Sequence, residues 1–238
     1  MARCLIVKNF FSYDPVVAKP ELPKGVDGIY ITDNEEDQKK ALSLGWNKAF
    51  LVTQFLTVID PLRKREIIAL MNCYPETVVS ELLAYDYVFI CDSNVVKLDS
   101  NYQVFLDQAS SNYALYVTSG WYRGDENNIT RELVRSLANS RWSYNFNEIT
   151  SCYQTYVQLL DRVGLNPGQC PVVSAKYIGW NLRHPTKKTI ADFVYGEYMK
   201  HLQGNITISV TAKLFPNDVY HYTGFINDGK VCSHLLQY

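Results

Sequence analysis

Short apolar runs alternate with helical patterns along the first half of the chain. The runs have the length and the content of β-branched and aromatic residues that buried strands require. Strands that alternate with helices are typical of a largely parallel sheet flanked by helices on both faces. The predicted strands cover residues 3–11, 27–33, 48–54, 85–91 and 113–119.

Local signals set the ends of the intervening helices. Asn34 is an N-cap for a helix that ends before Gly45, because a glycine tolerates the left-handed conformation that follows a helix. Asp60 and Pro61 predict the start of a second helix, since proline suits the first helical position. That helix should end before Pro75, where a short helix over 75–84 follows. A further helical pattern covers 99–110.

The second half is more mixed in pattern. Residues 205–216 fit a helix or a strand equally well, and the tail from 218 is short strand and loop. We therefore expect a single α/β domain with a mixed, largely parallel sheet, in which 1–120 bind a nucleotide and 121–238 form the acceptor side. The other patterns predict helices at 128–140, 145–164 and 186–203, and a strand at 170–182.

Composition narrows the class of protein. With 238 residues and 47% apolar side chains, the chain can bury one sizeable core. A net charge of −1 provides no basic surface for nucleic acid, and no stretch has the ~20 apolar residues of a membrane span. The six cysteines form no C-x-x-C pair and are expected to be buried thiols of a cytoplasmic, reducing compartment. The G-x-G-x-x-G, P-loop and G-x-S-x-G motifs are missing, which argues against dinucleotide oxidoreductases, P-loop NTPases and the commonest serine hydrolases.

An acid and an amide follow the apolar strand at 85–91. Asp92 and Asn94 lie one residue apart at its carboxyl end, where open α/β sheets bind their ligands. Oxygen ligands of this kind suit Mg²⁺ or Mn²⁺, which share them with the phosphates of a substrate. An Asx-turn uses the same residue types, so the motif alone does not separate a metal site from a turn.

The context of this motif resembles the family-A (GT-A) glycosyltransferases. The segment YDYVFICDSNV is similar to their metal-binding strand, which carries Asp-x-Asp at this place. YITDN resembles their base-reading segment, and IDPLRKREIIALMNCYP their basic helix. Asn94 departs from the pattern, because it replaces the second acid with a neutral oxygen ligand. The protein would then bind the metal more weakly, or the diphosphate of the donor would provide most of the metal binding.

A narrower resemblance is to a glycosyltransferase-like family of plants, bacteria and large algal viruses. It includes glycosyltransferase domains that build the capsid glycans of chlorella viruses. The resemblance covers most of the chain through short motifs: the basic residues 63–65, Tyr85–Tyr87, Asp92–Asn94, His184-Pro185 and Gln203–Asn205. His184, just after a strand, is expected to line a cleft.

The GT-A resemblance implies a nucleotide-diphosphate sugar, most simply a UDP-sugar, with Mn²⁺ or Mg²⁺ and a glycan or glycoprotein acceptor. Asp92 and Asn94 would hold the metal, with His221 as a late third ligand. The alternatives for these positions are a polar strand end, a helix cap, a solvated helix face and a hydrogen-bonded core histidine. The nucleotide candidates are Lys8, Asn9, Thr32, Asp33, Lys64, Arg65, Asp92, Ser93 and Asn94.

Sugar transfer by inversion also needs a general base near the acceptor hydroxyl. Glu197 and Asp192 are the first candidates, with Asp92 acting through the metal. Because they are five residues apart, Asp192 and Glu197 do not share a helix face, so at most one points into a cleft. Glu148 and Asp125 are weaker candidates. Trp121 and Tyr122 would stack on an acceptor sugar or pack in the core.

Two other classes of function remain open from the sequence. A metal-dependent phosphodiesterase or nuclease also uses strand-borne acids, although usually in clusters of three or four, and the sequence shows no such cluster around Asp92. A non-catalytic module that binds a nucleotide or a glycan would tolerate Asn94. The leading prediction is a metal-dependent hexosyl- or pentosyltransferase, with viral glycan synthesis as the narrower expectation.

Overall fold

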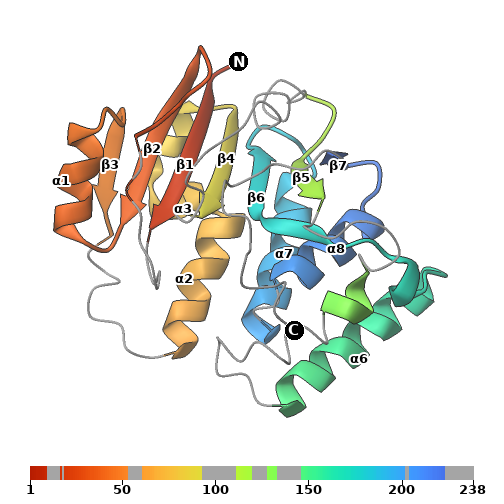
Figure 1. The fold of residues 1–238 in the computed structure, drawn as a ribbon. Coiled ribbons are helices and arrows are strands. Elements are labelled where there is room, and N and C mark those ends of the chain that lie inside the picture. The colour runs from red at the N-terminus through yellow and green to blue at the C-terminus, as the bar shows by residue number, and fades with distance from the viewer. Residues whose placement is uncertain are drawn as a thin grey trace.

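The structure is a computed structural model of the chain, shown in Figure 1. It describes residues 1–9, 17, 19–52, 61–92, 111–119, 128–132, 146–201 and 204–222.

The described residues form a seven-stranded sheet with the order β3-β2-β1-β4-β6-β5-β7. All neighbouring strands are parallel except β6, which is antiparallel to both β4 and β5. The carboxyl ends of the other six strands therefore lie at one edge, called here the carboxyl edge. The mixed, largely parallel sheet that the sequence predicts is confirmed. The strands are β1 (Arg3–Asn9), β2 (Val26–Thr32), β3 (Lys48–Leu51), β4 (Tyr87–Asp92), β5 (Leu115–Ser119), β6 (Val173–Asn181) and β7 (Val219–Tyr222).

Helices cover both faces of this sheet, as expected. On one face α2, α7 and α8 pack over the strands, with α2 beside α7. On the other face α1 packs its Ala41 against the strands. The helices are α1 (Glu35–Ser43), α2 (Pro61–Cys73), α3 (Pro75–Val78), α6 (Phe146–Arg162), α7 (Lys187–His201) and α8 (Gly204–Leu214), with 3₁₀ turns η2 (Ser80–Ala84) and η4 (Pro167–Gln169).

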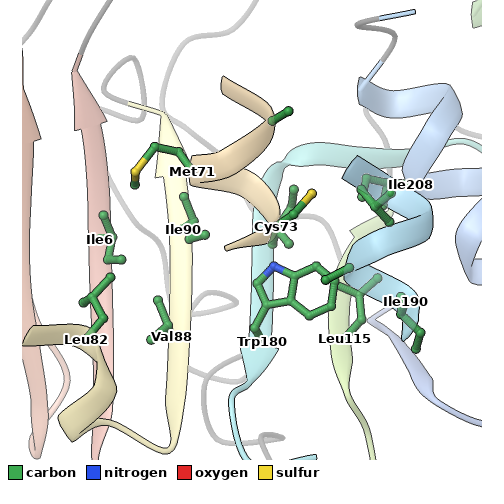
Figure 2. Close-up of a cluster of buried hydrophobic side chains, with 14 of the residues drawn as sticks. Ile6, Met71, Cys73, Leu82, Val88, Ile90, Leu115, Trp180, Ile190 and Ile208 are labelled. Atoms are coloured by element: carbon green, nitrogen blue, oxygen red, sulfur yellow. The ribbon is translucent and has the colours of Figure 1, made fainter. Parts of the chain in front are cut away.

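The central strands are buried on both faces, which explains their continuous apolar runs. Ile6 and Ile90 pack toward Met71 of α2, while Trp180 of β6 packs beside Cys73 (Figure 2). The described cysteines for which burial is known are free and buried, as the sequence predicts: Cys4, Cys73, Cys91 and Cys170. Burial raises the pKa of Cys4, Cys73 and Cys170, so these thiols act as small apolar groups.

The described helix ends agree with the predictions for α1 and α2, while the predicted cap Asp60 lies outside the described residues. The Asn34 side chain accepts hydrogen bonds from the backbone N–H of Glu36 at 2.8 Å and of Asp37 at 3.3 Å. Gly45 follows α1 with a φ of 98°. Pro61 is the first residue of α2. These ends are set by contacts within a few residues, which is why the sequence alone predicts them.

Two segments differ from their sequence patterns. The single helix expected over 75–84 is divided into α3 and η2, because Val79 between them has extended backbone dihedrals. The ambiguous segment 205–216 is the helix α8, which is buried over most of its surface. Two of its hydroxyls donate within the helix, Ser209 to the Asn205 carbonyl and Thr211 to the Thr207 carbonyl, while the Thr207 hydroxyl pairs with that of Tyr156. The helix predicted at 99–110 lies outside the described residues.

Candidate functional site

The ends of β1, β2 and β4 bring several predicted site residues to one stretch of the carboxyl edge. Lys8 of β1 pairs in register with Asp92, the last residue of β4. Asn9 pairs in register with Thr32, the last residue of β2. Neighbouring strands are ~4.8 Å apart, so residues that are distant in the sequence become adjacent. The side chains of Asn9 and Asp92 lie outside the described part of the structure.

Thr32 and Asp33 form the turn that leads from β2 into α1. Thr32 is completely buried, and its hydroxyl accepts a hydrogen bond from the backbone N–H of Asn34 at 3.1 Å. Its carbonyl accepts from the Val52 N–H at 2.9 Å. Thr32 therefore shapes the turn, and Asp33, which is half-buried, is the next side chain at the carboxyl edge.

The basic residues of α2 come before the part of the helix that packs on the sheet. Lys64 precedes Asn72 by eight residues, which corresponds to ~12 Å along a helix axis. Asn72 lies against Lys8, so the first turns of α2 project beyond the carboxyl edge (Figure 1). The side chains of Lys64 and Arg65 lie outside the described part, and so do Ser93 and Asn94 entirely.

A buried polar network at this edge was not predicted from the sequence. The Lys8 ammonium donates to Oδ1 of Asn72 at 2.6 Å, and Nδ2 of Asn72 donates to the Tyr198 hydroxyl oxygen at 3.2 Å. These residues come from β1, α2 and α7, and their sequence separations of 64 and 126 residues leave no local signal. Asparagine is mostly exposed in folded proteins, so the burial of Asn72 is an exception that the sequence does not predict.

The two acids of α7 lie in different surroundings. Glu197 is buried, and its Oε1 accepts from the Lys200 ammonium at 2.8 Å. Its Oε2 is buried with no hydrogen-bond partner in the described part of the structure. Asp192 is exposed, and hydrogen bonds from Lys188 and Tyr74 lower its pKa. The expectation that these two acids do not share a surface is confirmed.

His221 is the third residue of β7, at the carboxyl edge but away from Asp92. The strands β6 and β5 lie between β4 and β7, so three strand spacings, ~14 Å, separate the two backbones. Desolvation lowers the pKa of His221, and the positive charge of Lys213 lowers it further. The imidazole is therefore neutral at pH 7, the form that binds metals.

His184 does not lie at the candidate site. Because β6 runs antiparallel, its last residue Asn181 pairs with Tyr87, the first residue of β4, at the edge opposite the carboxyl edge. His184 follows there, with Nδ1 2.9 Å from the Thr186 hydroxyl. The "HP" segment thus forms a turn on the far side of the sheet from the candidate site.

Both polar groups of the Asn205 side chain make hydrogen bonds within the protein. Its Oδ1 accepts from the backbone N–H of Ala175 at 2.8 Å, and its Nδ2 donates to Glu132 Oε1 at 2.8 Å. The remaining weaker candidates have no described side chain: Glu148 lies in α6, and Trp121, Tyr122 and Asp125 lie outside the described residues.

Within the described ranges, no group of three or more His, Cys, Asp or Glu side chains is arranged to hold a metal ion. Asp92, at the end of β4, remains the position from which an acidic ligand could reach an ion at the carboxyl edge. In the same part of the chain, no helix is both long enough and apolar enough to cross a membrane.

Two solved structures with a similar fold are glycosyltransferases. Mouse xyloside xylosyltransferase 1 matches with a TM-score of 0.53 and 8% identity, over 93% of this chain and 84% of that protein. The bifunctional glycosyltransferase WbbM matches with a TM-score of 0.51 and 11% identity, over 92% of this chain and 38% of WbbM. The chain therefore has a GT-A glycosyltransferase fold. No protein-family model and no curated protein matches its sequence.

Proposed function

We propose that the chain is a glycosyltransferase that takes a sugar from a nucleotide-diphosphate donor to a glycan or glycoprotein acceptor. The fold shared with two glycosyltransferases over more than nine tenths of the chain carries the proposal. The register of β1, β2 and β4 supports it, because Lys8, Thr32 and Asp92 meet at the edge where α/β sheets bind nucleotides. In this proposal 1–120 bind the donor and 121–238 form the acceptor side.

The proposed donor is a UDP-sugar bound with Mn²⁺ or Mg²⁺. Asp92 would be the acidic ligand and Asn94 a neutral one. The predicted third ligand, His221, lies three strand spacings (~14 Å) from Asp92 across β6 and β5, which is farther than two side chains can reach toward one ion. A bound divalent ion would neutralise charge on the leaving diphosphate. Asp33 at the end of β2 would accept hydrogen bonds from the base or the ribose, and Lys64 and Arg65 would approach the phosphates from α2.

Glu197 is the stronger candidate for a general base, with Asp192 as the alternative. Glu197 is 5% exposed on the helix whose next residue, Tyr198, joins the network at the carboxyl edge. Its buried Oε2 has no hydrogen-bond partner in the described part of the structure, so a lone pair there can accept a proton. Asp192 is exposed, and its hydrogen bonds favour the charged form, so it is the weaker base.

The narrower expectations remain predictions. They are a place in the glycan synthesis of a large algal virus, a cytoplasmic compartment and a hexosyl or pentosyl donor. A UDP-sugar screen that includes hexoses and pentoses addresses the last of these directly.

Thermal unfolding with a panel of UDP- and GDP-sugars, in Mn²⁺ and in EDTA, tests the proposal. A ligand at a hundredfold excess over its dissociation constant stabilises the folded state by ~2.7 kcal/mol. For a domain of this size that corresponds to a rise in Tm of roughly 5–10 °C. We expect one nucleotide class to give such a rise, with a smaller rise in EDTA. No change with any member of the panel would contradict the proposal.

The products separate the other two classes of function. Release of a nucleoside diphosphate together with transfer or hydrolysis of the sugar supports the glycosyltransferase. Release of a nucleoside monophosphate would indicate a phosphodiesterase. Tight binding with an intact donor after prolonged incubation with acceptor glycans would indicate a non-catalytic module. Chromatography of one reaction mixture distinguishes these outcomes.

A further inference from the structure

The ammonium of Lys8 is held in place by a chain of buried polar groups. Lys8 Nζ donates to Asn72 Oδ1 at 2.6 Å, and Asn72 Nδ2 donates to the Tyr198 hydroxyl oxygen at 3.2 Å. Asn72 is 3% exposed and Tyr198 2% exposed, so the hydrogen bond between them is shielded from solvent, whereas Lys8 itself is half-buried. A buried polar group without a hydrogen-bond partner is costly. Because Asn72 and Tyr198 satisfy each other, this series of hydrogen bonds is stable.

The orientation of the Asn72 amide is fixed from several sides. Its nitrogen faces Tyr198, so its oxygen faces Lys8. Its backbone carbonyl accepts from Trp180 Nε1 at 2.7 Å, which anchors the end of α2 to β6. A Cβ atom at Gly204 would lie 2.8 Å from the Tyr198 hydroxyl, so the start of α8 closes against that group. Asn72 cannot rotate without breaking this packing.

Asn72 orients the Lys8 ammonium through its amide oxygen. The backbone register places Lys8 beside Asp92, where the proposed donor diphosphate would lie. A site with one acid and one amide, in place of two acids, carries less negative charge than Asp-x-Asp. A lysine next to it suits a diphosphate, because phosphate oxygens accept charge-assisted hydrogen bonds.

We propose that Lys8 binds the diphosphate of the donor and that Asn72, supported by Tyr198, is its positioning residue. This inference rests on the proposed function and deepens it. It also narrows the sequence-based expectation that Lys8 binds the nucleotide, because it assigns Lys8 to the diphosphate. Lys8 would stabilise the leaving diphosphate together with the metal ion, while Asn72 and Tyr198 would act only through Lys8.

Calorimetric titration with UDP and with uridine in Mn²⁺ separates phosphate binding from base binding. Lys8→Met keeps the length of the side chain and removes the charge. We expect the Kd for UDP to rise roughly 10- to 100-fold, as for the loss of one charge-assisted hydrogen bond, and the Kd for uridine to stay within about twofold. Lys48→Met, which removes an exposed lysine at the start of β3, is the matched control and should leave both values unchanged. Equal losses for UDP and uridine would overturn the assignment to the diphosphate.

A double-mutant cycle tests the positioning role of Asn72. Asn72→Ala should raise the Kd for UDP roughly 3- to 10-fold in the wild-type background and less than about twofold in the Lys8→Met background, because its effect passes through Lys8. Equal effects in the two backgrounds would show a merely structural role. If Asn72→Ala does not fold, Tyr198→Phe, which removes only the hydroxyl, tests the same coupling.

The two levels of the proposal fail separately. Wild-type protein that binds neither UDP nor uridine in Mn²⁺ would overturn the proposed UDP donor and this inference with it. Wild-type binding that is lost in Asp92→Ala but retained in Lys8→Met would overturn only the role of Lys8.

Discussion

His221, which the sequence predicts as a late metal ligand, has a partly buried imidazole. Desolvation disfavours its charged form in the folded protein, and Lys213 disfavours it further, so its pKa is lower in the folded state than the ordinary value of 6.5. Between these two pKa values the unfolded chain binds more protons than the folded one. Stability therefore falls as pH decreases below about 6.5, until the folded-state pKa is passed.

Replacing His221 removes this proton-linked loss. We expect the urea midpoint of the wild-type protein in EDTA to fall more between pH 7.5 and pH 5.5 than that of His221→Gln. The glutamine keeps a polar side chain of similar length but has no proton to gain in this range. Parallel urea titrations at the two pH values provide the measurement, and identical declines for both proteins would contradict it.

At the residue scale, the sequence predicts what is decided by near neighbours. Asn34 caps its helix through N–H groups two and three residues ahead, and Asp92 ends its strand as the pattern indicates. Asn72 and Tyr198 were missed, because their hydrogen bond joins residues 126 positions apart. Such a network depends on how β1, α2 and α7 pack, which no local pattern records.

At the element scale, β6 depends on a glycine for its close packing in the sheet. A Cβ atom at Gly179 would lie 2.6 Å from Cδ1 and 2.7 Å from Cε1 of the Phe89 ring. On the other side, the added Cβ atom would lie 3.0 Å from Cβ of Tyr116. Phe89 and Tyr116 are both buried, so neither neighbour has room to move. By contrast, a Cβ atom at Gly196 in α7 would meet nothing within 4 Å.

These two glycines predict opposite effects of the same substitution. Gly179→Ala should destabilise the protein by about 1–3 kcal/mol, because it overpacks the core. Gly196→Ala should stabilise it by roughly 0.5–1 kcal/mol, because alanine favours the helix. Urea unfolding monitored by circular dichroism measures both changes. A Gly179→Ala variant as stable as the wild type would show that β4 and β6 do not pack as described.

The element-scale predictions fail where two patterns give the same sequence signal. The segment 205–216 was ambiguous because its apolar and hydroxyl residues alternate from 206 to 211, as in a strand, whereas α8 buries all six of these residues. The direction of β6 was not predicted either, since an apolar strand pattern is the same in both directions. Because β6 is antiparallel to β4, His184 lies at the edge of the sheet opposite the carboxyl edge.

At the scale of the whole molecule, the fold gathers the proposed donor site from segments far apart in the sequence. Six strands end at the carboxyl edge, while α2 extends past it (Figure 1). The sequence predicted this arrangement because strands that alternate with helices allow few topologies. It could not predict which side chains converge, and for Ser93 and Asn94 the question lies outside the described residues.

The central claim is that a nucleoside diphosphate and a divalent ion bind at the end of β4. Calorimetric titration of UDP with Mn²⁺ and with EDTA, on the wild type and on Asp92→Ala, tests it most directly. We expect the wild type to bind in Mn²⁺ and Asp92→Ala to bind at least ~10-fold more weakly, with a smaller difference in EDTA. Asp161→Ala, which removes an exposed acid of α6, should bind like the wild type. Equal affinities of the wild type and Asp92→Ala in Mn²⁺ would contradict the account.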